Sequence, residues 1–187
     1  FEKLSDVKMP ATKLEFLVKM LRKQIKEYGK VNQLAAKSFQ EMLEKTIAEY
    51  HERRKHLTAE EAGEAQEQAS EDVIKIATEQ ALAILRQMNE NRERFRKIGL
   101  TFEEKAFYDI LISVADKHGF RDKIPDDKFI FLAKEIQKMV SNKSKYTDWT
   151  NRQDVKDELY TDVAVLLKKN GYPPRTIDDA YDEIMKQ

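Results

Sequence analysis

Apolar side chains recur at steps of three and four residues along almost the whole of this 187-residue chain. Leu14, Leu17 and Leu21 begin one such stripe, and Val155 and Leu159 belong to another. This spacing places the side chains on one face of an α-helix, whereas a strand alternates every second residue. The chain contains no alternating apolar run bounded by hairpin turns. The pattern predicts an all-α fold, an irregular bundle of about six to seven helices.

Polar residues that can cap a helix precede most of the stripes. Thr58, Thr101 and Thr150 are each followed three residues later by Glu or Gln, which predicts three capping boxes. Asn32, Asp126 and Thr176 are predicted to cap three further helices.

Glycines stand where four of the helical patterns stop, at positions that favour a left-handed backbone. They are Gly29, Gly99, Gly119 and Gly171. The predicted helices therefore span about 10–28, 32–55, 58–98, 101–118, 126–140, 150–170 and 176–184.

We interpret residues 1–187 as a single helical assembly domain, with a helical hairpin at about 32–97 and a C-terminal helical core at about 100–187. Residues 59–71 offer only alanines and Gly63 among polar side chains, so this stretch has little with which to pack on a core. It is either a protruding hairpin tip or a solvent loop. Because the chain begins at Phe1 without a methionine, we expect it to be part of a longer protein.

Composition excludes several classes of protein. No apolar run approaches the roughly 20 residues needed to cross a bilayer, so we expect no membrane association. The absence of cysteine excludes disulfides and thiolate metal sites. We expect a cytoplasmic protein. The balance of 34 basic and 34 acidic residues is not that of a strongly cationic nucleic-acid module.

The chain also lacks the residue patterns of a catalytic, metal or nucleotide site. None of its glycines belongs to a phosphate-binding loop. His51 and His56 are five residues apart, which separates them by about 140° around a helix instead of placing both on one face. We therefore assign no catalytic residue, no metal ligand and no cofactor-binding residue to this chain.

Basic residues and a few aromatic residues are the remaining candidates. Basic residues that could contact a partner or phosphate are Lys19, Arg22, Lys23 and Lys26 on the first helix and Arg53, Arg54 and Lys55 at the end of the second. The alternative is a solvated helix face. Tyr108, Trp149 and Tyr172 are interpreted as structural anchors, because acidic residues and not arginines lie beside them.

Three segments together resemble a known family: AKSFQEMLEKTIAEYHER at 36–53, LTFEEKAFYDIL at 100–111 and DWTNRQDVKDELYTDVAVLLKKNGYPP at 148–174. Their order and spacing are similar to those of the C-terminal helical region of the type I restriction enzyme R subunit. The chain departs from the family pattern at Lys156 and over residues 58–72.

The resemblance implies a piece of a large motor subunit whose nuclease and helicase-like ATPase domains precede Phe1. ATP and Mg²⁺ would serve that parent protein, and its activity would be ATP-dependent DNA translocation and cleavage. The fragment itself would be non-catalytic. It would dock the R subunit onto the methyltransferase (M) and specificity (S) subunits, and DNA would be met through the parent complex.

Two alternatives to docking remain at this point. The region could be an accessory helical domain that contacts DNA through the basic first helix, or a purely structural support for the helicase domains. Steep salt dependence of binding would distinguish contact with phosphates from docking through an apolar centre.

Overall fold

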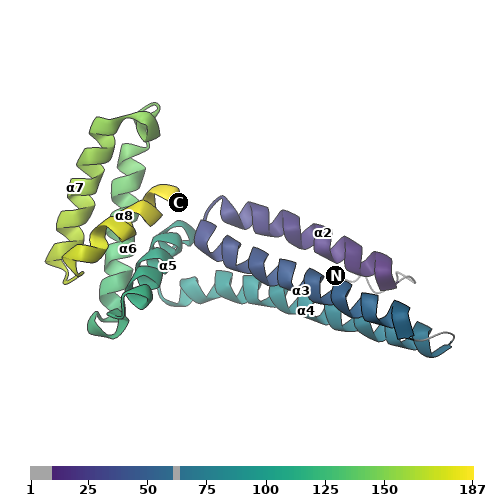
Figure 1. The fold of residues 1–187 in the computed structure, drawn as a ribbon. Helices are drawn as coiled ribbons and strands as arrows, with labels where there is room; N and C mark the ends of the chain where they lie inside the picture. The colour runs from purple at the N-terminus through teal and green to yellow at the C-terminus, as the bar shows by residue number, and fades with distance from the viewer. Residues whose placement is uncertain (1–9, 61–63) are drawn as a thin grey trace. The chain divides into compact units, whose positions relative to one another are not determined.

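The computed structural model describes residues 10–60 and 64–187, and over these ranges the chain is all-α without a strand (Figure 1). Seven α-helices and three short 3-10 helices lie within them, so the predicted fold class is confirmed. None of these helices combines the length and apolar character that a bilayer crossing needs. The chain divides into two compact units. We call them the N-terminal unit, residues up to 30 and 36–92, and the C-terminal unit, residues 31–35 and 93–187.

The N-terminal unit consists of α2 (Pro10–Gly29) and most of α3 (Gln33–Glu60) and α4 (Glu64–Lys97). Each helix contributes one apolar stripe to a shared core, as the spacing predicts. The buried apolar residues of this unit are Leu14, Leu17, Leu21, Ile25, Tyr28, Ala36, Phe39, Leu43, Ala77, Ala81, Ile84 and Met88.

Successive helices of the N-terminal unit run in opposite directions (Figure 1). Arg22 pairs with Glu44 at 3.3 Å, and six residues further along α2 the ring of Tyr28 meets that of Phe39, which lies earlier in α3. The Tyr28 hydroxyl also donates to Asn91 Oδ1 of α4 at 2.8 Å. These contacts fix α2 against both of its neighbours.

The C-terminal unit contains α5 (Phe102–Lys117), α6 (Asp126–Lys143), α7 (Gln153–Lys169) and α8 (Ile177–Lys186). Helices α5 and α7 each pack on both α6 and α8. Three 3-10 helices lie in the connections: η1 (Arg121–Lys123), η2 (Trp149–Asn151) and η3 (Pro174–Thr176). The fully buried core includes Leu111, Ala115, Phe129, Leu132, Ala133, Ile136, Leu159, Val163, Leu167 and Ala180.

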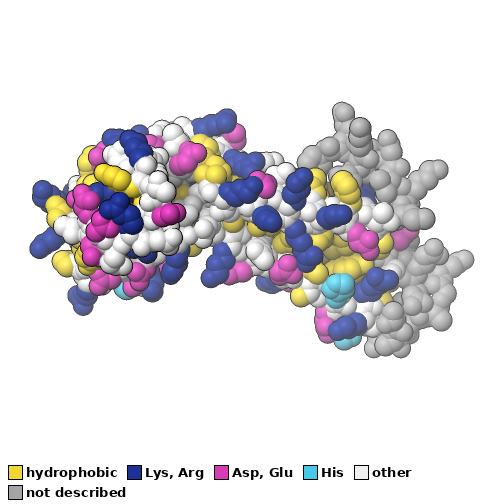
Figure 2. Space-filling view, turned by 90° about the horizontal axis from the view of Figure 1, so that it is seen from above, with side chains coloured by type: hydrophobic (Ala, Val, Ile, Leu, Met, Phe, Trp, Pro, Cys, Tyr) yellow, Lys and Arg dark blue, Asp and Glu magenta, His cyan; other side chains and the backbone are white. Residues whose placement is uncertain are grey.

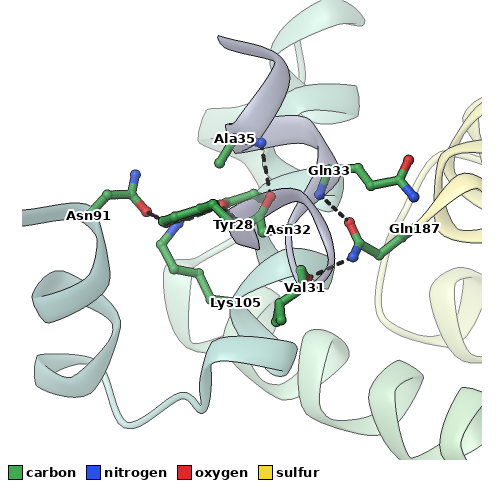
Figure 3. A network of polar contacts seen from close by, with 9 residues as sticks. Tyr28, Val31, Asn32, Gln33, Ala35, Asn91, Lys105 and Gln187 are labelled. Carbon is green, nitrogen blue, oxygen red and sulfur yellow. Dashed lines mark hydrogen bonds and ion pairs between the residues drawn. The ribbon is translucent and has the colours of Figure 1, made fainter. Parts of the chain in front are cut away.

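A buried polar network joins residues 31–35 to α5 within the C-terminal unit (Figure 3). Asn32 is fully buried, and its Nδ2 donates to Asp109 Oδ2 at 2.7 Å. The ammonium of Lys105, itself 6% exposed, donates to both oxygens of Asp109 at 2.6 and 2.5 Å. Burying a charge is costly unless it is paired, and here each group has a partner.

The last residue of the chain is held by the same short segment. Gln187 Nε2 donates to the carbonyl of Val31 at 2.7 Å, and Gln187 Oε1 accepts from the backbone N–H of Gln33 at 2.9 Å (Figure 3). Residues 31–35 thus belong to the C-terminal unit through side-chain bonds as well as packing.

Two of the predicted helix caps are confirmed. Asn32 Oδ1 accepts from the N–H of Ala35 at 2.9 Å and caps α3. Thr101 and Glu104 form a complete capping box at the start of α5, in which Thr101 Oγ1 accepts from Glu104 N at 3.2 Å and Glu104 Oε2 accepts from Thr101 N at 2.7 Å.

The capping box predicted at Thr150 is wrong. Thr150 lies inside η2, which follows a left-handed residue, Asp148 (φ 54°), and α7 begins only at Gln153. The N-cap is Arg152, whose guanidinium binds Asp154 and makes no capping bond. An N-cap residue needs an extended backbone, and Thr150 cannot adopt one because it lies within the tight 3-10 turn.

Two further cap predictions are also wrong. Pro125 and not Asp126 is the N-cap of α6, because the proline holds an extended backbone (φ −62°, ψ 151°) and the helix begins one residue later. Thr176 occupies the N-cap position of α8 but donates its hydroxyl to the Pro173 carbonyl at 2.8 Å. The cap predicted at Thr58 is wrong as well, because Thr58 lies inside α3, which continues to Glu60, and α4 begins only at Glu64. Residues 61–63, at the tip of the predicted hairpin, lie outside the described residues.

Three of the four glycines predicted to be left-handed have that conformation: Gly99 (φ 72°), Gly119 (φ 67°) and Gly171 (φ 84°). Gly29 does not, and the prediction for it is wrong. It is the last residue of α2, and a Cβ there would lie 3.3 Å from the Cβ of Ala36. Gly29 therefore allows a close approach of the α2 and α3 backbones.

Candidate interaction groove

A groove of about 460 Å³ lies between α2 and α3 of the N-terminal unit. Leu14 and Val18 of α2 and Ile47 of α3 form its apolar walls, and Ala77 of α4 lies at its floor. The lining residues recur every three or four positions on each helix, so they form one continuous strip on each wall. Figure 2 shows apolar side chains gathered on the face that carries the histidines of this unit.

Charged side chains line the rim of this groove. Lys19 and Arg22 stand on the α2 side together with Glu15, and Arg54 and His51 stand on the α3 side. All five are exposed. The rim thus carries three permanent positive charges and one negative charge around an apolar strip.

The predicted basic residues are not all part of the groove. Lys19, Arg22 and Arg54 line it. Lys23, Lys26, Arg53 and Lys55 are exposed on the same two helices but do not line it. The structure thus brings residues from both predicted basic clusters to the edges of one surface.

Several groove residues were not predicted as functional. The periodicity assigns Ile47 and Tyr50 to the core stripe of α3, yet both are only partly buried and line the groove. The sequence feature that could have identified them is the apolar stripe of α3, which continues beyond Leu43, the last buried apolar residue described on that helix. Tyr50 stacks at an angle on His51, with ring centroids 5.3 Å apart, and its hydroxyl accepts from Arg54 Nη1 at 3.4 Å.

The predicted anchor Tyr172 lies deep in the core of the C-terminal unit. It is 1% exposed, its hydroxyl donates to the Leu111 carbonyl at 2.9 Å, and its ring meets Phe120 edge to face at 4.8 Å. Burial raises the pKa of the Tyr172 phenol, because the charged form would lose its hydration. Tyr172 therefore fixes the exit of α7 and is not part of a surface.

The other two predicted anchors keep some exposed surface. Trp149 is partly buried against the core of its unit from the turn η2. Tyr108 is partly buried on α5, and desolvation followed by the nearby Asp126 carboxylate raises the pKa of its phenol. Arg121 stands beside Asp126 and over the ring of Phe129 at 4.8 Å.

Titratable side chains of the described residues form ion pairs and no metal cluster. Among residues 11–57 and 69–187, whose side chains are described, no three His, Asp or Glu side chains are placed to hold an ion. His56 lies 3.4 Å from Glu52, and His118 and Lys117 both contact Asp179, at 2.8 and 2.7 Å. Hydrogen bonds from Lys117 and then His118 hold the pKa of Asp179 below its usual value.

Comparison with known proteins gives a consistent result. A family model described as "Type I restriction enzyme HindI endonuclease subunit-like, C-terminal" matches residues 1–187. A protein of Methanocaldococcus jannaschii, described as a type I restriction enzyme MjaIXP endonuclease subunit, is 29% identical over 157 residues, which cover 84% of this chain. The type I restriction enzyme HindI endonuclease subunit of Haemophilus influenzae is 28% identical over 192 aligned positions, which cover the whole chain. No solved structure matches.

The matched regions are small parts of those relatives. They amount to 13% of the M. jannaschii protein and 16% of the H. influenzae protein.

Proposed function

The chain belongs to the family of C-terminal regions of HindI-like type I restriction endonuclease subunits, and from that premise we propose that it docks its subunit onto the methyltransferase and specificity subunits of a restriction complex. The observation that carries this proposal is the groove of the N-terminal unit, which combines an apolar strip with a charged rim. Protein interfaces combine an apolar centre with a polar rim in the same way.

The distribution of charge favours a protein partner over DNA. Arg22 is paired with Glu44 at 3.3 Å, and Arg53 lies 4.0 Å from Glu49. Carboxylates beside these two arginines weaken their attraction for a phosphate backbone, whose binding depends on uncompensated positive charge. Binding of a partner in the groove would be favourable, because it would remove the apolar side chains of the groove from water.

The catalytic work is proposed to belong to the rest of the subunit. ATP-dependent translocation and cleavage of DNA would need ATP and Mg²⁺ bound by domains outside this chain. We propose that this region contributes no catalytic group and meets DNA only through the assembled complex.

Contact with DNA is the second candidate. It is supported by the exposed stripe of Lys19, Arg22, Lys23 and Lys26, which follow one another at helical spacing on α2. Phosphate contacts make the affinity fall steeply with salt, with a slope in log K of about −0.9 for each phosphate neutralised. Docking through the groove would change little over the same range of salt.

Removal of the region tests the docking proposal directly. The full-length endonuclease subunit would be compared with a version that lacks residues 10–187 for association with the purified methyltransferase–specificity complex, at several salt concentrations. We expect the truncated subunit to lose association and to keep DNA-dependent ATP hydrolysis, which shows that the motor is folded. Normal association of the truncated subunit would refute docking. Loss of DNA affinity with a steep salt slope would favour the second candidate.

A further inference from the structure

The groove has the shape that a helix fills. Its two walls are neighbouring antiparallel helices, and α4 covers the other side of the same pair, so that Ala77 is reached at the floor. A helix laid along the groove would pack on α2 and α3 and complete a four-helix arrangement. This is the general mode in which an amphipathic helix occupies a hydrophobic groove, with anchors at i, i+3, i+4 and i+7.

Two of the rim cations have no acidic partner among the described residues. Lys19 makes no ion pair there, and Arg54 donates a hydrogen bond to the neutral hydroxyl of Tyr50 at 3.4 Å. They stand on opposite walls of the groove. A partner with carboxylates on both sides of its apolar face would satisfy them, whereas a basic helix would be repelled.

The spacing of these cations along the groove follows from the helix pairing. Arg22 lies level with Glu44, and α2 and α3 run in opposite directions. Arg54 is ten residues beyond Glu44 on α3, so it lies about 15 Å along the groove from Arg22 and about 10 Å from Lys19. Carboxylates on a bound helix would meet Lys19 and Arg54 when they are about two turns apart.

We propose that this groove binds one amphipathic helix of a protein subunit in the restriction complex, with apolar residues in the groove and carboxylates facing Lys19 and Arg54. The inference rests on the docking function proposed above and specifies the chemistry of the partner.

A peptide titration tests the recognition itself. The probe is an 18-residue designed helix with leucines at i, i+3, i+4 and i+7 and with flanking glutamates about two turns apart. The full-length subunit would be titrated into the fluorescent peptide, and binding would be followed by fluorescence anisotropy. Two matched peptides serve as controls, one with lysine in place of every glutamate and one with the same composition in scrambled order. We expect the acidic peptide to bind at least tenfold more tightly than either control.

Charge reversal provides the sharpest form of the test. In the double variant Lys19→Glu with Arg54→Glu, the acidic peptide should bind at least tenfold more weakly, about 1.4 kcal/mol, and the lysine peptide should bind better than before. The matched control is Lys23→Glu with Arg53→Glu, which makes the same change of charge at neighbouring exposed positions outside the groove. The control should leave the preference for the acidic peptide unchanged. A reversal of preference cannot result from loss of folding.

A variant that blocks the apolar strip tests the other half of the proposal. Val18→Glu places a charge on the wall and should abolish binding of the acidic peptide, whereas Phe16→Glu on the same helix, which replaces an exposed side chain outside the groove, should not. Equal peptide affinity in the charge-reversed and control variants would overturn the assignment. Two other results would also overturn it. One is a subunit that dimerises through the groove and becomes monomeric in Val18→Glu, and the other is a subunit that binds duplex DNA in the groove instead of the peptide.

The outcomes separate this inference from the docking proposal. If the subunit without residues 10–187 fails to associate while the charge-reversed subunit associates normally, docking stands and the groove assignment falls. If the truncated subunit associates normally, docking falls, and the peptide titration still reports whether the groove binds an acidic helix.

Discussion

The N-terminal unit leaves an apolar groove open between two of its helices. The C-terminal unit instead closes its core with Tyr172, whose hydroxyl donates a hydrogen bond to the Leu111 carbonyl. Long helices with one stripe each form the first unit. Shorter helices joined by 3-10 turns and left-handed glycines form the second. A long helix pair can present a uniform strip to a partner, while a core made of many short elements encloses its apolar residues on all sides.

This difference assigns separate roles to the two units. The groove residues Ile47 and Tyr50 are partly buried, so they contribute modestly to the unit that contains them and remain accessible to a partner. Tyr172 and Lys105 are enclosed and cannot contact a partner without unfolding, and Asp109, which is paired with Lys105, keeps only 20% of its side-chain surface exposed. We therefore expect substitutions at the enclosed residues of the C-terminal unit to affect stability, and substitutions at the groove residues of the N-terminal unit to affect mainly association.

The largest expected effect concerns two tyrosines, one in each unit. Tyr172→Ala should lower the free energy of unfolding by about 3 to 5 kcal/mol, because it empties a fully enclosed site, while Tyr50→Ala in the groove wall should cost about 1 kcal/mol. Tyr172→Phe removes only the bond to the Leu111 carbonyl and should cost about 1 kcal/mol. Urea unfolding followed by circular dichroism measures all three. A cost for Tyr50→Ala equal to that of Tyr172→Ala would show that the groove wall is packed as tightly as the core of the C-terminal unit.

The next effect concerns an ion pair from each unit. Asp109→Ala leaves the buried Lys105 ammonium and the Asn32 amide without their acceptor, and we expect a loss of about 2 to 4 kcal/mol. Arg22→Ala removes the exposed pair with Glu44 and should cost about 0.5 kcal/mol or less. Both are measured by urea unfolding.

A double variant is the control for the buried pair. Lys105→Met with Asp109→Asn removes both charges and keeps an acceptor for Asn32, so it should recover part of the stability lost in Asp109→Ala. A double variant less stable than the single variant would mean that the pair itself stabilises the fold.

The sequence predicted the helices well because each apolar stripe needs only local spacing. The stripe that begins at Leu14 and the capping box of Thr101 and Glu104 depend on residues within a few turns of one another. The failure at Thr150 has a tertiary cause. The left-handed Asp148 and the 3-10 turn place Trp149 against the core, and this arrangement displaces the helix start to Gln153.

The groove and the buried network could not be predicted in the same way. Lys105 and Asp109 are four residues apart and could be paired from the sequence, but Asn32 lies 77 residues from Asp109 and joins them only in the folded chain. Ile47 and Tyr50 continue a core stripe, and only the packing of α2 on α3 shows that no side chain of the described residues closes over them.

Trp149 is expected to have an intermediate effect. Truncation of a fully enclosed indole to alanine costs about 3 to 5 kcal/mol. The structure places it partly buried, so we expect about 1 to 2 kcal/mol, less than for Tyr172→Ala. Because Trp149 is the single tryptophan, unfolding is followed by circular dichroism. A loss as large as that of Tyr172→Ala would show that the turn η2 closes the core as fully as Tyr172 does.

The smallest effects concern surface carboxylates, for which the two units should not differ. A hydrogen bond from Lys30 lowers the pKa of Glu27 in the N-terminal unit, and hydrogen bonds from Lys117 and His118 lower that of Asp179 in the C-terminal unit. A carboxyl whose pKa is lower in the folded chain stabilises the fold above its unfolded pKa, about 3.9 for Asp and 4.3 for Glu, and that contribution is lost as the pH falls through the folded pKa.

Glu27→Gln and Asp179→Asn should therefore both lower the urea midpoint slightly at pH 7. In each case the difference from the unsubstituted chain should shrink as the pH falls below about 4, and it should also shrink at high salt, because exposed pairs are screened. Unfolding curves at neutral and acidic pH, each at low and high salt, measure this. If Asp179→Asn cost far more than Glu27→Gln at neutral pH and kept that cost in high salt, surface charge as well as core closure would distinguish the two units.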